Sequence, residues 1–427
     1  MSMDRRDFSK TMAFAAMAGL LNARKVFSEP APAVAGSPLP HDALYPEFSH
    51  APLTIDKIEI FPVRYPMVMR FKFFEGPVSS GGRPSIIIKI TANDGTVGWG
   101  ESVPIPRWSG ETLEGAVACL KNYLVPVLIG KNVFDLEDIH HTMTKELAGD
   151  FSTTYPITKA GIDIALYDLI GKAMGKNVAE LWGRTTPEDL VLSWTLNPVK
   201  LDDVEGLIQK GRDRGFENFN VKVSPDTKVD LELCKMVRKA APKGFLWIDA
   251  NCGYDTATAL QMAPKFADIG VEVFEGPLHP NCISGYQALV KQGALPIIMD
   301  EGCVSPVEVA EFMKLKMMNG IAMKPSRCGG LTSAVGQLRL LEKNKMLFLG
   351  SGLTDPDISL AATLNLYGAF GLKKPAALNG PQFLGESVLK DPFKVVGGKV
   401  KIPKGHGLGI EVDEDKVRDL SARTGTI

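Results

Sequence analysis

Five charged residues, two lysines and three acids, stand at the ends of successive short apolar runs and recur with an almost constant step. They are Lys222, Asp249, Glu275, Asp300 and Lys324, separated by 27, 26, 25 and 24 residues. A charged side chain that closes a buried strand is costly unless it is paired or bound to a metal. Because the parallel strands of a barrel all end at one face, this register predicts a ring of charges at the C-terminal mouth of a parallel barrel, where such folds carry their chemistry.

The three acids of this ring, Asp249, Glu275 and Asp300, would converge on one point if their strands are neighbours. Ligation by oxygen alone favours a hard divalent cation, and three protein ligands leave room for water and substrate oxygens. The sequence therefore predicts a Mg²⁺ site, with Mn²⁺ as an alternative ion. The competing interpretation is that acids at strand ends make salt bridges or helix caps, and three acids in one register favour the metal.

The two lysines, Lys222 and Lys324, lie one strand before and one strand after the acids. In a closed ring they would face each other across the metal. A nearby cation and partial burial both lower the pKa of a lysine, which makes a neutral amine available as a base. The metal would take up the negative charge that develops when a proton leaves the carbon alpha to a carboxylate. Two bases on opposite faces permit racemisation, whereas one base and a leaving group give elimination.

The composition narrows the class of protein. A chain of 427 residues with 45% hydrophobic and 23% charged residues has enough apolar sequence for a large core and two domains. The 48 basic and 49 acidic residues nearly balance and form no basic stripe, so we expect no nucleic-acid partner. Beyond the N-terminus, no stretch has the roughly 18 unbroken apolar residues of a membrane helix, so we expect no membrane span in the mature protein.

The N-terminus carries a different kind of signal. Arg5 and Arg6 are followed by Phe8 and Lys10, then by a mildly apolar stretch and a segment rich in Pro, Ala and Ser. This pattern resembles a twin-arginine export signal. We therefore expect residues 1–35 to be a signal peptide and linker, the twin-arginine export machinery to be a partner, and the mature protein to be periplasmic or exported.

Residues 53–180 have the pattern of an α+β domain. Runs rich in β-branched residues up to about residue 100 predict antiparallel strands, and Asn93-Asp94-Gly95 predicts a tight turn between two of them. Helical patterns follow at 111–129, 135–147 and 156–174. We expect the last of these to be amphipathic, with one apolar stripe, and the whole block to form a capping domain.

Between residues 190 and 380 short apolar runs alternate with helical segments, which is typical of βα units. A doubly wound sheet is the main competitor, but no glycine-rich phosphate loop follows the first strand. The sequence thus predicts a TIM-type barrel, in the α/β class. Its expected strands are 191–196, 218–224, 245–250, 271–275, 295–300, 320–324, 346–350 and 376–379.

These motifs together resemble the enolase superfamily, and within it the muconate-lactonizing-enzyme subgroup of the mandelate racemase/muconate lactonizing enzyme family. The resemblance spans roughly residues 53–413. It rests on Trp247-Ile248-Asp249-Ala250-Asn251, Phe274-Glu275-Gly276-Pro277, Met299-Asp300-Glu301-Gly302, Met323-Lys324-Pro325, Gly329-Gly330-Leu331-Thr332, Gly98-Trp99-Gly100-Glu101, Ala165-Leu166-Tyr167-Asp168-Leu169 and the tail from Pro403 to Asp413.

The resemblance implies a modified TIM barrel, (β/α)7β, with an N-terminal α+β capping domain that the C-terminal segment 381–427 completes. It implies Mg²⁺ on the three acids of the ring and acid/base roles for its two lysines. It also implies a homo-oligomer, a small-molecule carboxylate as substrate, and selectivity set by capping-domain loops at about 65–83 and 102–110.

Two positions depart from the family's usual pattern. The second barrel strand usually reads Lys-x-Lys, and here it reads Asn220-Val221-Lys222, which removes one positive charge beside Lys222. The eighth strand often carries Asp-x-Asp-Gly, which holds a substrate ammonium in dipeptide epimerases, and here it ends in Asn379-Gly380. We therefore expect other carboxylates, rather than dipeptides, as substrates. The candidate substrate contacts are Asn220, Asn251 and Asn379 in the barrel and Arg83, Arg107 and Trp108 in the expected lid.

The sequence thus predicts an exported, Mg²⁺-dependent enzyme that abstracts the proton alpha to a carboxylate and forms a metal-stabilised enolate. The lysines on both sides of the three acids favour an isomerase, namely a racemase or epimerase of an amino acid derivative or related acid. The alternative is a lyase, a dehydratase or cycloisomerase of a hydroxy, imino or sugar acid, which the substitution at Asn220 supports. A third alternative is a non-catalytic binding protein, and the intact set of acids and lysines argues against it.

Overall fold

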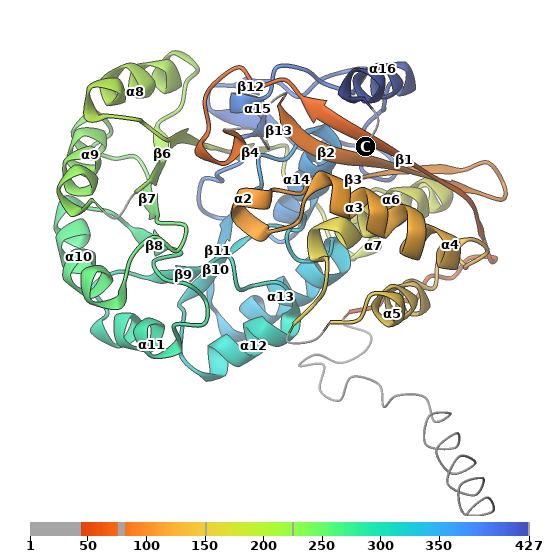
Figure 1. Cartoon of the computed structure of the whole chain (residues 1–427), viewed down its shortest axis with the longest axis horizontal. Helices are drawn as coiled ribbons and strands as arrows, with labels where there is room; N and C mark the ends of the chain where they lie inside the picture. Colours follow the sequence, from red (N-terminus) through yellow and green to blue (C-terminus); the bar gives the residue numbers. More distant parts are fainter. Residues whose placement is uncertain (1–43, 76–81, 150–151, 224–225, 426–427) are drawn as a thin grey trace, which may run out of the picture. The chain divides into compact units, whose positions relative to one another are not determined.

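The structure, a computed structural model, describes residues 44–75, 82–149, 152–223 and 226–425, which all belong to one compact unit, Leu39–Ile427 (Figure 1). The predicted signal peptide and linker, residues 1–35, lie outside the described residues. Among the helices that are described, none combines the length and the apolar character needed to cross a membrane.

A three-stranded antiparallel sheet forms the base of the capping domain. Its strands are β1 (Ile55–Tyr65), β2 (Arg83–Ala92) and β3 (Val97–Ser102), in the order β1-β2-β3. The turn between β2 and β3 contains Gly95 at φ +89°, a conformation that a residue with a side chain rarely adopts. The expected helices follow as α3 (Leu113–Cys119), a π turn, α4 (Val125–Leu128), α5 (Leu136–Glu146) and α6 (Pro156–Met174).

Helix α6 corrects one expectation, because it is not amphipathic: every residue from Ile157 to Gly171 is buried. The helix packs on β3 and β2 on one side and on barrel helices on the other, so no face is left for solvent. Glycines on β3 allow the backbone of α6 to pack closely against that strand. A Cβ atom on Gly98 would lie 2.2 Å from the carbonyl oxygen of Ala165, and one on Gly100 would lie 1.9 Å from that of Gly161. The Gly-x-Gly motif of β3 is thus a packing feature.

The barrel contains seven parallel strands in the order β11-β10-β9-β8-β7-β6-β5, so each strand pairs with its neighbour in sequence. Helices α8 to α12 lie on the outside of these strands (Figure 1). The strands are β5 (Ser193–Leu196), β6 (Asn218–Lys222), β7 (Leu246–Asp249), β8 (Val273–Glu275), β9 (Ile297–Met299), β10 (Gly320–Met323) and β11 (Leu347–Gly350). The intervening helices are α8 (Val204–Asp213), α9 (Thr227–Ala240), α10 (Thr256–Ile269), α11 (Ile283–Gln292), α12 (Pro306–Lys314), α13 (Leu331–Asn344) and α14 (Asp357–Ala369).

The eighth strand is reduced to a short link between the two edges of this sheet. Ala376 N donates to Val191 O at 2.9 Å, and Ser193 N donates to Ala376 O at 2.8 Å. On the other side, Ala377 N donates to Gly350 O at 2.9 Å. Two residues therefore close the ring, at the start of the predicted strand 376–379.

The C-terminal segment divides between two places. Its strand β12 (Val395–Val396) pairs with β13 (Lys399–Lys401), and β13 pairs with β4 (Asp189–Val191), which directly precedes the barrel. Its last helix, α16 (Glu414–Thr424), packs on β1 of the capping sheet. The start of the segment also contacts the capping domain, because Gly385 N donates to Pro66 O at 2.9 Å.

A buried carboxylate on α6 joins the capping domain to the barrel. Asp163 accepts hydrogen bonds from the backbone N–H groups of Leu331 and Thr332, at 2.5 and 3.1 Å, and from the Thr332 hydroxyl at 2.6 Å. Gly330 makes room for it, since a Cβ there would lie 2.2 Å from Asp163 Oδ2. A side chain of the capping domain thus satisfies the first N–H groups of α13, which directly follows Lys324 and its loop.

We expect Asp163→Ala to lower the free energy of unfolding by roughly 3 kcal/mol, because it leaves buried N–H groups without a partner. Asp135→Ala is the matched control: Asp135 caps α5 in the same way, accepting from Asp138 N at 3.0 Å, but it is exposed. Its loss should cost about 1 kcal/mol. Denaturant unfolding of both variants measures the difference, and equal losses would contradict the proposed link between domains.

Candidate active site

The five ring residues lie together at the C-terminal ends of five adjacent strands. Lys222 is paired in register with Asp249, and Asp249 with Glu275. Asp300 directly follows β9, and Lys324 directly follows β10. The three acids are fully buried, and one carboxylate oxygen from each lies within 4.8 Å of the others. The structure thus brings the predicted metal ligands to one point.

Two of the three acids have cationic partners within the protein. Lys222 donates to Asp249, and both Lys324 and Arg327 donate to Asp300. Glu275 differs, because neither of its carboxylate oxygens has a hydrogen-bond partner among the described residues. Burial raises the pKa of Glu275 well above its ordinary value, and the neighbouring acids raise it further. The ionised form of Glu275 is therefore strongly unfavourable in this setting unless a positive charge compensates it.

A divalent cation fits this arrangement. Three convergent oxygen donors, one of them wholly unsatisfied, are the ligands that Mg²⁺ prefers, and an ion there would take up the charge of Glu275. Burial alone would lower the pKa of Lys222, but the carboxylates of Asp249, Glu275 and Asp300 together outweigh that effect, so its pKa lies above the ordinary value. The predicted lowering of the Lys222 pKa therefore depends on a cation that offsets the charge of the acids.

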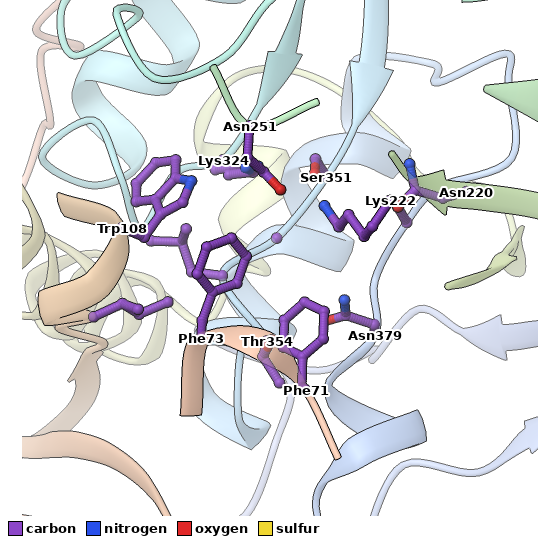
Figure 2. Close-up of a pocket in the computed structure, with 14 residues that line it drawn as sticks. Phe71, Phe73, Trp108, Asn220, Lys222, Asn251, Lys324, Ser351, Thr354 and Asn379 are labelled. Atoms are coloured by element: carbon purple, nitrogen blue, oxygen red, sulfur yellow. The ribbon is translucent and has the colours of Figure 1, made fainter. Parts of the chain in front are cut away.

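A small pocket opens over the two lysines (Figure 2). In Figure 2 the side chains of Lys222 and Lys324 point toward one another from opposite sides of the pocket. The capping domain contributes aromatic rings, Phe71, Phe73 and Trp108, and the face of Trp108 covers the Nζ atom of Lys324 at 4.7 Å from the ring centroid. The pocket thus has a charged floor supplied by the barrel and an apolar roof supplied by the capping domain.

Three asparagines at the ends of barrel strands line the same pocket. Asn220 Nδ2, Asn251 Oδ1 and Asn379 Oδ1 are buried and have no hydrogen-bond partner among the described residues. The other amide atoms are used: Asn251 Nδ2 donates to Asp249 at 3.2 Å, and Asn379 Nδ2 donates to the hydroxyl of Thr195 at 3.4 Å. Unsatisfied buried polar atoms need a partner. These three predicted substrate contacts therefore have free hydrogen-bonding capacity toward the pocket.

The two arginines of the predicted set need correction. Arg83 is fully buried and donates to the carbonyl oxygens of Val103 and Leu353, at 3.1 and 2.7 Å, so its guanidinium cannot meet a substrate anion. It instead ties the capping sheet to the loop after β11, where Leu353 lines the pocket. Arg107 is exposed, and its guanidinium donates to the backbone oxygen of Lys72 at 3.5 Å. Of the three candidate substrate contacts in the lid, namely Arg83, Arg107 and Trp108, only Trp108 lines the pocket.

The sequence reasoning also missed residues that the structure places at the site. Phe71 and Phe73 lie inside the expected lid loop, but aromatic residues in a loop carry no signal of their direction. Arg327 donates to Asp300 from three residues beyond Lys324. Glu301 is half-buried next to Asp300, and desolvation together with the neighbouring acids raises its pKa to about 7. Its position next to Asp300 in the sequence was the available signal.

Comparison with known proteins identifies the family that has this architecture. The model of the enolase C-terminal domain-like family matches residues 203–416, and that of the mandelate racemase/muconate lactonizing enzyme N-terminal domain matches residues 62–183. The chain belongs to the mandelate racemase/muconate lactonizing enzyme family of the enolase superfamily. The muconate lactonizing enzyme from Pseudomonas putida superimposes with a TM-score of 0.78 at 22% identity, covering 86% of this chain and 99% of that one. The predicted modified TIM barrel with a capping domain is confirmed.

Two relatives in this family have different named activities. A chloromuconate cycloisomerase of Delftia acidovorans is 29% identical over 363 residues, which cover 84% of this chain and 95% of the relative. An N-succinyl-L-Arg/Lys racemase of Bacillus cereus is 27% identical over 382 residues, which cover 86% and 98%. The comparisons therefore establish an enolase-superfamily enzyme and leave two reaction types, of which cycloisomerisation is the better supported.

Proposed function

We propose that this enzyme is a Mg²⁺-dependent cycloisomerase of an unsaturated carboxylic acid. The observation that carries the proposal is the buried acid triad between two lysines, with Glu275 left without a partner among the described residues, beneath an apolar roof. Several of the relatives are named as muconate or chloromuconate cycloisomerases. This reading corrects the expectation from sequence, which placed a racemase first and a cycloisomerase second.

Asp249, Glu275 and Asp300 would hold the ion, with Mn²⁺ as an alternative to Mg²⁺. Bound there, the ion would stabilise the negative charge that collects on the substrate carboxylate during the reaction. In a cycloisomerisation, an oxygen of a second carboxylate forms a C–O bond to the alkene, and the alkene electrons move toward the carbon alpha to the first carboxylate. That carbon then accepts a proton, and the ring is closed without loss of atoms.

The two lysines are suited to different parts of this reaction. Lys324 Nζ lies against the face of Trp108 and donates to Asp300, and both contacts favour a standing positive charge. Lys222 has no such ring over it in the described contacts and lines the pocket together with Asn220. We assign proton delivery to Nζ of Lys222 and charge stabilisation to Lys324.

Racemisation or epimerisation of a carboxylate is the second candidate. Lysines on both sides of the triad are what two-base proton transfer requires, and one relative is named as a racemase. Asn379 stands at the end of the last barrel link, and it provides an unsatisfied oxygen but no negative charge. A substrate with a free ammonium group would lack an ionic partner there, which favours N-acylated amino acids over dipeptides.

One experiment separates these functions. The protein is incubated with Mg²⁺ in D₂O, first with cis,cis-muconate and its chlorinated analogue, then with N-acylated amino acids. Loss of the diene absorbance and a lactone with one deuterium at its α-carbon supports the cycloisomerase. Deuterium at an α-carbon with inverted configuration supports the racemase. No reaction with any of these acids would contradict both and leave a non-catalytic binding protein.

We also propose that the enzyme is exported by the twin-arginine route and is a homo-oligomer. The support for export is the pair Arg5-Arg6 with Phe8 and Lys10. Replacing both arginines by lysine should retain the full-length precursor inside the cell, as fractionation and immunoblotting would show. Light scattering of the purified protein measures the oligomeric state, and a monomer mass would contradict the second proposal.

A further inference from the structure

The loop that follows β11, residues 351–354, forms one wall of the active-site pocket and supplies none of its charged groups. Its last residue, Thr354, has a backbone φ of +55°, in the left-handed region. A β-branched residue rarely adopts this conformation, which persists only where the surrounding contacts impose it and which is concentrated at functional sites. Thr354 is 1% exposed and lines the pocket (Figure 2), so its backbone strain lies at the site itself.

Two buried side chains impose this conformation from opposite sides of the loop. Arg83, on β2 of the capping domain, donates to the carbonyl oxygens of Leu353 at 2.7 Å and Thr354 at 3.3 Å. Asp355 accepts from Leu353 N at 3.2 Å, and its other carboxylate oxygen accepts from two serine hydroxyls at 2.8 and 2.9 Å. The backbone is thus fixed directly before and after Thr354, and the direction of its side chain is fixed with it.

The order of the strands places Thr354 across the pocket from the acid triad. Counted around the ring from β5, Asp249 and Glu275 stand on the third and fourth strands, β7 and β8. Thr354 follows the seventh strand, β11, and Asn379 follows the short link that closes the ring in the eighth place. In a closed ring of this size the third place faces the seventh and the fourth faces the eighth. A substrate with one carboxylate at the triad therefore extends its other end toward Thr354 and Asn379.

The Thr354 hydroxyl has hydrogen-bonding capacity for that far end. It donates to no described residue, and the only atom of Thr354 in the hydrogen bonds of the described chain is its backbone oxygen. A buried donor without an acceptor needs a partner. None of the described residues that line the pocket is acidic, whereas Lys222 and Lys324 both line it, so the pocket favours an anion as that partner.

We propose that Thr354 is a specificity-determining residue whose hydroxyl donates a hydrogen bond to a second carboxylate at the far end of the substrate, and that Arg83 is the positioning residue that holds it there. This inference deepens the proposed function, on which it rests for a substrate with two carboxylates. The left-handed backbone then has a purpose, because it directs the hydroxyl into the pocket.

The test compares the binding of adipate, a dicarboxylate, with that of hexanoate, which has the same chain length and one carboxylate. Neither acid has an alkene that could cyclise, so calorimetry with Mg²⁺ present measures binding alone. In Thr354→Val the affinity for adipate should fall by about tenfold or more, because a hydrogen bond to a charged group is lost. The affinity for hexanoate should not change. Thr354→Ser keeps the hydroxyl and should keep the preference for adipate.

Two further variants separate binding from folding. Thr354→Gly should lose the preference for adipate without a fall in melting temperature, because glycine adopts a positive φ without strain. Thr363→Val is the matched control: Thr363 lies on α14, is fully buried and has a hydroxyl without a partner among the described residues, but it does not line the pocket. It should leave the affinities for both acids unchanged.

The role of Arg83 is tested by combining variants. Arg83→Lys should also lower the preference for adipate, and adding Thr354→Val to it should lower the preference little further, since both changes act through one hydroxyl. Equal losses for adipate and hexanoate in the Thr354 variants, or an unchanged preference, would overturn the proposal, as would a wild type that binds adipate no better than hexanoate. If muconate is not converted but the preference for adipate depends on Thr354, the proposed function fails and this inference stands.

Discussion

Glu275→Gln is expected to weaken Mg²⁺ binding by at least about a hundredfold and to abolish turnover, while it stabilises the metal-free protein. The carboxylate supplies one of the three ligand oxygens that lie within 4.8 Å of one another, and neither of its own oxygens has a hydrogen-bond partner among the described residues. An amide removes a charged ligand that the cation needs. In the absence of the cation, the same change removes a buried, unpaired charge and its repulsion with Asp249 and Asp300.

The prediction is specific because the same substitution should stabilise the metal-free protein and destabilise the Mg²⁺-bound protein relative to the wild type. In excess EDTA the melting temperature of Glu275→Gln should lie above that of the wild type, and in millimolar Mg²⁺ the order should reverse. Glu272→Gln is the matched control, because Glu272 precedes the same strand but is exposed and pairs with Lys374 at 2.9 Å. It should change neither affinity nor the response to EDTA. A variant that is destabilised equally with and without Mg²⁺ would mean that Glu275 has a structural partner and no metal.

Lys222→Met is expected to lower kcat by roughly 10²- to 10⁴-fold, the range for loss of a positioned proton donor. The conservative arginine variants distinguish the roles of the two lysines. Arginine keeps a positive charge but cannot serve as an acid at neutral pH. Lys324→Arg should therefore retain a substantial part of the activity, because charge is the property assigned to Lys324. Lys222→Arg should be as inactive as Lys222→Met.

The measurements are turnover of the carboxylic acid that the wild type converts and deuterium incorporation into its product. Mg²⁺ affinity is recorded for each variant to show that the metal site is intact. Under the racemase alternative both lysines carry protons, so both arginine variants would be inactive toward racemisation. Each would still exchange the α-proton of one enantiomer. An active Lys222→Arg with an inactive Lys324→Arg would reverse the assignment of the two residues.

The acid triad and the barrel could be predicted from the sequence because both arise from repeated local patterns. Each βα unit places one residue at a strand end, and units of similar length bring those residues to one face. The register of Lys222, Asp249 and Glu275 on adjacent strands follows from this regularity. The boundaries of the strands were predicted within a few residues for the same reason.

The predicted substrate contacts were less secure because they depend on packing between distant segments. Arg83 and Trp108 both lie in or near the expected lid, and nothing local distinguishes a guanidinium buried among carbonyl oxygens from an indole above the pocket. Helix α6 was expected to have a solvent face because its sequence contains lysines and acids. Asp163 and Asp168 are instead fully buried, and Asp163 caps a barrel helix.

By itself, the sequence determined the five charged strand ends, the acid triad among them and the family of the fold. Only the tertiary structure decided which positive charges surround that triad. Lys222 donates to Asp249, Lys324 and Arg327 donate to Asp300, and Glu275 has no hydrogen-bond partner among the described residues. The physical reason is that strand periodicity is local, whereas the electrostatic environment of Lys222 depends on every charge within a few ångströms, whatever its position in the chain.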